Sequence, residues 1–243
     1  MQNGIADLRA HGVKPAALLL DGIFASDGVF ADPAGFLAEA VAVARSEGLL
    51  YIADEVQSGF ARTGATMWGF QRHAVQPDIV TLGKPMGNGQ PIAGVVARAE
   101  VIESFGRSVR YFNTFGGNPV SCAAAKAVLD VIQEEGLQQR SAELGGYLLQ
   151  GFRRLAERHE LIGDVRGAGM FFGIELVSNR ETKEPAALVT RYIVNDLRER
   201  GVLISAAGPR ENILKIRPLL AFKKKHADLM LDALDQALGV SMN

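Results

Sequence analysis

The sequence predicts an α/β protein with a mainly parallel sheet, followed by a smaller α+β unit. Apolar runs of strand length occur at 16–21, 49–53 and 79–82. A segment with helical spacing at 33–47 separates the first two runs, which makes the strand–helix–strand unit of a parallel sheet. The pattern changes after Ile162, where short strand-like and helical segments mix. This change indicates a second unit.

In the first half of the chain, most expected elements have local start or stop signals. Asp32–Pro33 is typical of a helix start, with proline in the first turn, and Gly48 is a plausible stop. The connection Gly59–Gln76 is long for a compact domain, and such loops tend to line sites or interfaces. The other elements expected here are a helix end at 4–11, a strand at 92–97 and a short helix at 99–105.

Two long helices follow in the middle of the chain. Asn118 is a favourable cap and Pro119 suits the first helical position, so a helix is expected from here to Gly136. A second helix is expected at 138–158. We place the domain boundary within these helices, which divides the chain into residues 1–135 and 136–243.

The second part contains the elements of a small α+β unit. A strand-like stretch covers 165–177, with glycine interruptions. A helix fits 185–200, and short strands fit 202–205 and 213–217. An amphipathic helix is expected at 224–238.

Composition excludes several classes of function. The 26 basic and 27 acidic residues give a net charge of −1, which argues against a surface for nucleic acid or anionic membranes. No apolar run reaches the length of a membrane span. Cys122 is the single cysteine, so no internal disulfide forms and a cytoplasmic location is expected. The four histidines lack metal-ligand spacing, and no metal site is predicted.

Two polar residues directly follow predicted strands, and open α/β sheets bind ligands at such strand ends. Asp54 follows the run 49–53, and Lys84 follows the run 79–82 and a glycine. An amine in a partly desolvated site can lose its proton and form a Schiff base, whereas most lysines are solvated surface residues. A buried carboxylate can keep the ring nitrogen of pyridoxal phosphate protonated, whereas an acidic residue at a strand end is commonly a cap or turn former. The pattern alone leaves both alternatives open.

Four segments, spread along the chain in family order, resemble the class III aminotransferases, which are fold-type I enzymes that use pyridoxal phosphate. The segments are Ile52–Gly64, Pro77–Gly89, Asn113–Cys122 and Leu161–Leu176. The resemblance covers essentially the whole chain, which matches the C-terminal portion of such an enzyme. It implies that residues 1–135 are part of the pyridoxal-phosphate-binding large domain. Residues 136–243 are then an interdomain helix and the small C-terminal α+β domain.

The resemblance also implies roles for the residues around the first motif. Lys84 is implied to be the Schiff-base lysine, which later moves a proton. Asp54 is implied to pair with the pyridinium nitrogen of the cofactor. Val56 is expected to pack against the ring face, and Gln57 to contact the phenolic oxygen.

Two further residues acquire roles by the same resemblance. The hydroxyl of Thr114 is implied to reach the cofactor phosphate of a neighbouring subunit, so a homodimer with shared active sites is expected. The alternative for Thr114 is a turn hydroxyl bonded to its own backbone. Arg217 resembles the small-domain arginine that binds a substrate carboxylate, a task that suits bidentate pairing. The alternative for Arg217 is a plain surface charge.

The chain differs from the family pattern in two respects. The segments that bind the phosphate within the same subunit and stack on the ring belong to the part of the family that is not matched. We therefore expect weak or absent activity from this chain alone. Within Leu19–Gly28, family members commonly carry a Glu-Pro pair and later a Gly-Glu pair, where this chain has Asp21-Gly22 and Ser26-Asp27. This difference puts the usual handling of amino-acid substrates in question.

Three functions remain as candidates at the level of sequence. The first is a transaminase that acts on a small amine or amino acid with a keto-acid acceptor. The segments Gly83–Gly89 and Tyr111–Thr114 are closest to a branch containing ethanolamine-phosphate phospho-lyases, so the second is a phospho-lyase acting on an amino-alcohol phosphate. The third, from a different class, is a non-catalytic dimerisation or interaction module.

Overall fold

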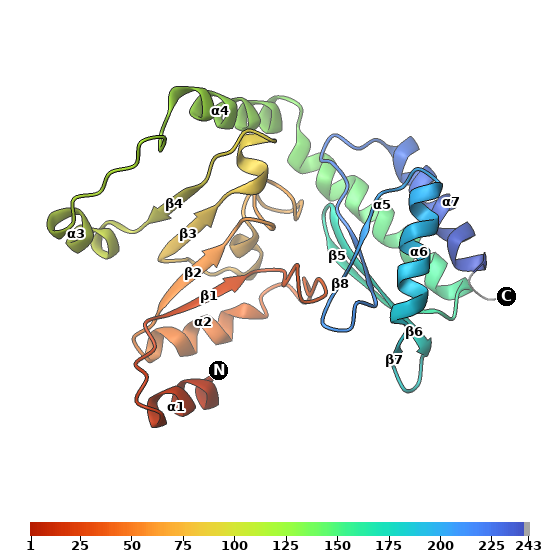
Figure 1. The fold of residues 1–243 in the computed structure, drawn as a ribbon, viewed down its shortest axis with the longest axis horizontal. Coiled ribbons are helices and arrows are strands. Elements are labelled where there is room, and N and C mark those ends of the chain that lie inside the picture. The colour runs from red at the N-terminus through yellow and green to blue at the C-terminus, as the bar shows by residue number, and fades with distance from the viewer. Residues whose placement is uncertain (241–243) are drawn as a thin grey trace. The chain divides into compact units, whose positions relative to one another are not determined.

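The structure of the protein, a computed structural model, describes residues 1–240 and contains two compact units (Figure 1). The first unit comprises Met1–Gly22, Pro33–Phe60 and Trp68–Glu135. The second comprises the segments Ile23–Asp32, Ala61–Met67 and Gly136–Asn243. Two short segments from the first half of the chain thus belong to the second unit, which a single boundary near residue 135 does not anticipate. The division of the chain into domains at that position stays a prediction.

The sheet of the first unit has four strands in the order β1-β2-β3-β4 (Figure 1). β1 (Ala17–Asp21), β2 (Leu50–Asp54) and β3 (Ile79–Leu82) are parallel, whereas β4 (Gly94–Ala97) is antiparallel to β3. The reversal follows from the short connection 83–93, because a parallel return needs a crossover of a dozen residues or more. The predicted α/β class with a mainly parallel sheet is confirmed.

The helices of the first unit largely follow the sequence signals. They are α1 (Gln2–Ala10), α2 (Leu37–Ser46), α3 (Ala99–Ser108) and α4 (Pro119–Glu134), with short 3₁₀ turns η1 (Gly69–His73) and η2 (Lys84–Gly87). The cap prediction for α4 is confirmed, because the Asn118 side chain accepts a hydrogen bond from the Ser121 amide at 2.9 Å. The predicted start of α2 at Asp32–Pro33 is wrong. Gly35 adopts φ = +91°, which interrupts a right-handed helix, and α2 begins two residues later.

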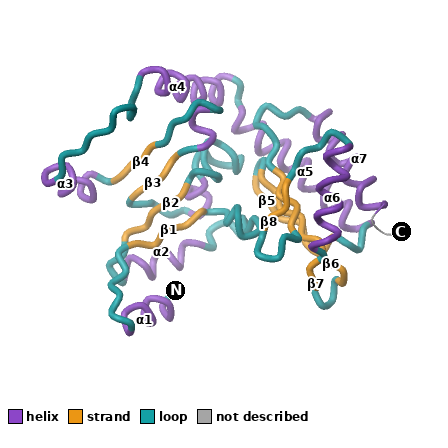
Figure 2. Tube along the Cα trace, viewed as in Figure 1, coloured by secondary structure: helices purple, strands orange, loops and turns teal. Residues whose placement is uncertain are grey.

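An extended loop joins α3 to α4 and contains Thr114 (Figure 2). Most residues of this loop are exposed. Its last turn leads directly into the capped start of α4. The position of Thr114 therefore depends on how the loop ends at this helix.

The sheet of the second unit is antiparallel and has the order β5-β6-β9-β8, with β7 paired to β6. Its strands are β5 (Ile162–Ala168), β6 (Phe171–Asn179), β7 (Glu184–Pro185), β8 (Ser205–Ala207) and β9 (Ile213–Ile216). The expected single stretch 165–177 forms two strands instead, because Gly169 takes a left-handed turn at φ = +54°. The strand expected at 202–205 is displaced, and β8 begins only at Ser205.

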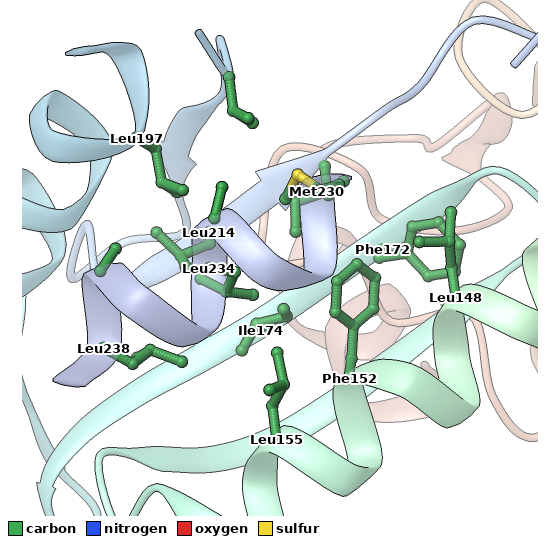
Figure 3. Close-up of a cluster of buried hydrophobic side chains, with 14 of the residues drawn as sticks. Leu148, Phe152, Leu155, Phe172, Ile174, Leu197, Leu214, Met230, Leu234 and Leu238 are labelled. Atoms are coloured by element: carbon green, nitrogen blue, oxygen red, sulfur yellow. The ribbon is translucent and has the colours of Figure 1, made fainter. Parts of the chain in front are cut away.

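Among the described residues, the helices of the second unit are α5 (Leu137–Arg158), α6 (Ala187–Glu199) and α7 (Lys224–Val240). Their apolar faces and the sheet enclose one buried cluster (Figure 3). Phe152 on α5 meets Phe172 on β6 edge-to-face, with 5.2 Å between ring centroids. Burial of each such side chain contributes about 1.5–3 kcal/mol. No helix within residues 1–240 is long and apolar enough to cross a membrane.

Candidate functional site

The carboxyl end of β2 places Asp54 between two neighbouring strand ends. In register, Asp54 lies opposite Asp21 on β1 and Thr81 on β3. Its Oδ1 accepts hydrogen bonds from the Val56 amide at 3.0 Å and from the Thr81 hydroxyl at 3.4 Å. Both bonds end on the same oxygen. Within the part of the chain that the structure describes, Oδ2 of this half-buried carboxylate stays available as an acceptor.

Lys84 follows the neighbouring strand β3 and begins η2. Its side chain is exposed, and its backbone adopts φ = +40°. A left-handed conformation costs a non-glycine residue roughly 1–2 kcal/mol, and such strain tends to persist at functional sites. A Cβ built on Gly83 would lie 3.7 Å from Cγ2 of Val56. The segment leading into Lys84 therefore runs directly beside Val56.

The structure thus brings three of the predicted site residues together at the end of one sheet. Asp54, Val56 and Lys84 belong to the ends of β2 and β3 and to the segments that leave them. Gln57 follows Val56 on the same segment and is half-buried. Thr81, which sequence reasoning missed, contacts Asp54 directly. The available signal was a polar residue inside the apolar run 79–82.

Glu55, next to Asp54 in the chain, has a different role. Its buried carboxylate accepts hydrogen bonds from the amides of Gly69 (2.6 Å) and Phe70 (2.8 Å) and from the Ser58 hydroxyl (3.2 Å). Burial raises the pKa of Glu55, and these hydrogen bonds act in the opposite direction. This carboxylate therefore anchors the start of η1.

Thr114 lies exposed in the turn before α4. The side chain of Asn113 closes this turn, because its Oδ1 accepts hydrogen bonds from the amides of Phe115 (3.1 Å) and Gly116 (2.8 Å). The Thr114 hydroxyl makes no such bond among the described residues. The large side chains around it, Tyr111, Phe112 and Phe115, are 70–79% exposed, and exposed apolar groups of this kind mark interaction surfaces.

Arg217 belongs to the second unit, where it follows β9, and its side chain is exposed. No carboxylate within the described residues pairs with it. The residue after Arg217, Pro218, is held by Arg62. Nη1 of Arg62 donates to the Pro218 carbonyl and to the Met170 carbonyl, the latter at 3.3 Å. Burial lowers the pKa of Arg62 to about 10, and the charge of Arg217 acts in the same direction. Sequence reasoning missed these two hydrogen bonds of Arg62, because they join residues far apart in the chain.

Cys122, the single cysteine, is exposed on α4. Within residues 1–240, no group of three or more His, Cys, Asp or Glu side chains is gathered closely enough to hold a metal ion.

Comparison with known proteins identifies the family. Residues 3–238 match the family model described as aminotransferase class-III. The chain is 45% identical over 97% of its length to alanine–glyoxylate aminotransferase 2 homolog 2, mitochondrial, of Arabidopsis thaliana, covering 49% of that protein. It is 40% identical over 96% of its length to ethanolamine-phosphate phospho-lyase homolog 1 of Caenorhabditis elegans, covering 50% of that protein.

A solved structure gives the same answer. The structure of a phospholyase from Arthrobacter in complex with phosphoethanolamine matches 98% of this chain and 56% of the other, with a TM-score of 0.94 and 44% identity. The chain therefore belongs to the class III aminotransferases, enzymes whose cofactor is pyridoxal phosphate. It spans about half the length of the curated relatives named above.

The residues at the end of β2 and β3 fit such a cofactor. Asp54 offers a carboxylate oxygen without a partner in the described chain. Lys84 offers an exposed amine on the adjacent strand end. Val56 presents methyl groups beside the backbone of Gly83. These are the acceptor, nucleophile and apolar contact that an aromatic aldehyde with a protonated ring nitrogen requires.

Proposed function

We propose that this chain contributes the catalytic lysine and the ring-nitrogen partner of a class III aminotransferase. The whole protein would transfer the amino group of a small amine or amino acid to a keto acid. The observation that carries this proposal is the pairing of Asp54 and Lys84 at neighbouring strand ends, with Asp54 Oδ2 unengaged by the described residues.

Each residue of the site has a defined task in this proposal. Pyridoxal phosphate, when bound, supplies an electron sink for the negative charge that forms on the substrate carbon. Asp54, whose Oδ2 has no partner among the described residues, would keep the proton on the ring nitrogen, and Val56 would pack against the ring. Gln57 contacts the phenolic oxygen. The amine of Lys84 takes the proton from the substrate carbon and returns it during amino transfer.

Thr114 and the residues beside it support the proposal of a homodimer. In this proposal, the Thr114 hydroxyl binds the cofactor phosphate in the partner's site. Support comes from its lack of a partner within the described residues and from the exposed aromatic side chains around it. Those side chains would become buried when two copies associate.

Arg217 is proposed to bind an anionic group of the substrate. Its guanidinium is exposed and has no acidic partner among the described residues. The Arg62 guanidinium donates a hydrogen bond to the carbonyl of Pro218, the residue that follows Arg217. A fixed backbone at this point would limit the positions that the Arg217 side chain samples.

A phospho-lyase acting on an amino-alcohol phosphate is the second candidate, favoured by the similarity to the Arthrobacter phospholyase. The two reactions give different products. A phospho-lyase releases inorganic phosphate without a keto acid, whereas a transaminase consumes the amine only when a keto acid is present. Measurement of both products with one enzyme preparation, using phosphoethanolamine and a simple amino acid as substrates, separates them.

The decisive test for the site is where pyridoxal phosphate attaches. The purified chain is incubated with pyridoxal phosphate, reduced with borohydride, digested and analysed by mass spectrometry. We expect the modification at Lys84. The internal comparison is Lys126, which is also exposed but donates to Asp130 at 2.6 Å.

The Lys84→Arg variant serves as the control, since it keeps the charge and removes the reactive amine. Equal labelling of all surface lysines by pyridoxal phosphate would contradict the assignment of Lys84 as the attachment site. An unchanged total amount of labelling in Lys84→Arg would contradict it as well. A Lys84→Ala change without effect on any measurable function would favour a non-catalytic interaction module.

The cellular location remains a proposal as well. A cytoplasmic setting rests on the presence of a single cysteine. The Arabidopsis relative is named as mitochondrial. Fractionation of cells that express the complete gene decides between the two compartments.

A further inference from the structure

A chain of hydrogen bonds begins at Gln90, just beyond the turn that contains Lys84. Gln90 donates from Nε2 to the hydroxyl of Ser121 on α4 at 2.9 Å. The Ser121 side chain is buried, so this bond is made in a poorly solvated position. The bond joins the connection between β3 and β4 to the first turn of α4.

The same hydroxyl belongs to the cap of α4. The side-chain amide of Asn118 donates to Ser121 Oγ at 3.1 Å and to the carbonyl of Phe115 at 2.9 Å. Oδ1 of Asn118 in turn accepts from the Ser121 amide at 2.9 Å. Phe115 belongs to the turn that Asn113 closes and in which Thr114 lies. Because the Gln90 amide also donates to the carbonyl of Gly87 in the Lys84 turn at 3.0 Å, the bonds connect the Lys84 turn to the Thr114 turn.

The Lys84 turn needs support from outside itself. η2 contains four residues; its first residue, Lys84, has φ = +40°, and Asn88, which directly follows η2, has φ = +47°. Residues in this region persist only where the surrounding structure holds them. The short backbone bonds within the turn, Met86 to Gly83 and Asn88 to Pro85, are local. The bond from Gln90 adds an attachment to a long helix.

We propose that Gln90 and Ser121 are positioning residues that hold the Lys84 turn and couple it to the turn carrying Thr114. Among the described residues, Gln90 makes no hydrogen bond with Lys84 or Thr114, and it acts through the helix cap. This inference rests on the proposed roles of Lys84 and Thr114. In a dimer with shared sites, it would link the lysine of one site to the phosphate-binding hydroxyl of the other.

Hydrogen–deuterium exchange of the intact chain tests the coupling without cofactor. The variant Gln90→Met removes the donor and keeps a side chain of similar length. We expect exchange to become roughly 2- to 10-fold faster, the range that one lost hydrogen bond gives. This acceleration should occur in two separate peptides, 84–92 and 112–118. Both contain amides that are hydrogen-bonded in the structure, including those of Met86, Asn88 and Phe115.

Two controls separate positioning from a general loss of structure. Gln139→Met makes the same chemical change at an exposed glutamine, whose side-chain amide donates to Glu143 at 2.8 Å. It should leave both peptides unchanged. Gln90→Glu should restore protection, because the Ser121 hydroxyl can donate to the new carboxylate.

Ser121→Ala provides an independent route to the same result. It should accelerate exchange in the 84–92 peptide as Gln90→Met does, and the double variant should show no further increase. Faster exchange confined to 84–92 in both variants would overturn the coupling. Additive effects of the two changes would overturn the shared bond.

Labelling of Lys84 then distinguishes this inference from the proposed function. If the unaltered chain takes up pyridoxal phosphate at Lys84, Gln90→Met should reduce that labelling and shift its pH dependence, while Gln139→Met should not. If the unaltered chain is not labelled at Lys84, the function assigned to Lys84 fails. The exchange measurement still decides whether the two turns are coupled.

Discussion

The two units differ in how completely they bury their apolar side chains. In the second unit, residues from α5, β6, β9 and α7 form one continuous buried cluster, which includes Phe152, Phe172 and Leu234. In the first unit, buried residues form small clusters around Ala44 and Tyr51. Because burial of apolar surface is the main stabilising contribution, the second unit holds more of the packing energy.

The first unit also leaves several large apolar side chains exposed to solvent. Val95 and Val96 on β4 are more than half exposed, as are Phe112 and Phe115 beyond α3. The proposed cofactor residues and the left-handed Lys84 belong to this same unit. The second unit therefore holds the larger buried cluster, and the first carries the proposed cofactor residues beside exposed apolar side chains.

The largest expected effect comes from an aromatic ring in the second unit. Phe172→Ala should destabilise the chain by about 3–5 kcal/mol, because it removes a fully buried ring and leaves a cavity. Phe115→Ala removes an equal ring that is 79% exposed, and it should change the free energy of unfolding by less than about 0.5 kcal/mol. Urea denaturation measures both at a concentration where the chain is monomeric. Equal losses would remove the contrast between the units.

A substitution at Asp78 tests whether hydrogen bonds to a buried carboxylate stabilise the first unit, as apolar packing stabilises the second. Its buried carboxylate accepts from the Tyr51 amide at 2.8 Å and from Arg98 at 2.7 Å. Asp78→Asn should cost about 1.5–3 kcal/mol at pH 7, the range for hydrogen bonds to a charged group. Urea midpoints at a series of pH values provide the measurement.

The pH dependence of this effect has a defined sign. Burial raises the pKa of Asp78, but the bonds from Tyr51 and Arg98 and the charge of Arg45 outweigh it, and the pKa is lowered overall. The carboxylate therefore stabilises the fold above its unfolded pKa of about 4, and this contribution is lost as the pH falls through the lower folded value. The difference in urea midpoint between wild type and Asp78→Asn should therefore become smaller as the pH is lowered. Asp130→Asn, which breaks an exposed pair with Lys126, should show little gap at any pH.

Adjacent glycines on α5 test how tightly the second unit is packed. A Cβ on Gly145 would lie 2.2 Å from the carbonyl oxygen of Gly169, whereas a Cβ on Gly146 meets nothing within 4 Å. Gly145→Ala should therefore cost about 1–3 kcal/mol through overpacking. Gly146→Ala should stabilise by about 0.5–1 kcal/mol, because alanine favours the helix. Thermal melting of both variants gives the comparison, and a stabilising Gly145→Ala would show that this contact can relax.

The smallest expected effect concerns backbone strain in the first unit. Ala74 directly follows η1 and adopts φ = +52°, a conformation that glycine adopts without strain. Ala74→Gly should stabilise the chain by up to about 1 kcal/mol. Ala42→Gly, at an exposed position inside α2, should destabilise it by about 0.5–1 kcal/mol. Destabilisation by both changes would argue against strain at Ala74.

Elements with strong local signals were predictable from the sequence. The three parallel strands follow apolar runs, and α4 begins at the predicted Asn118–Pro119 pair. These features depend on residues within one turn or one strand of each other. Where the local signal competed with a nearby glycine, as at Gly35 and Gly169, the predicted boundary was wrong.

The family, the order of its motifs and the candidates Asp54 and Lys84 were determined by the sequence by itself. The tertiary structure decided which atoms are engaged. The Glu55 carboxylate accepts hydrogen bonds from backbone amides of η1, whereas Asp54 keeps one carboxylate oxygen available in the described chain. Bonds such as Gln90 to Ser121 or Arg62 to Pro218 join residues 31 and 156 positions apart. No local pattern encodes such bonds, because they exist only when packing has brought distant segments within hydrogen-bonding distance.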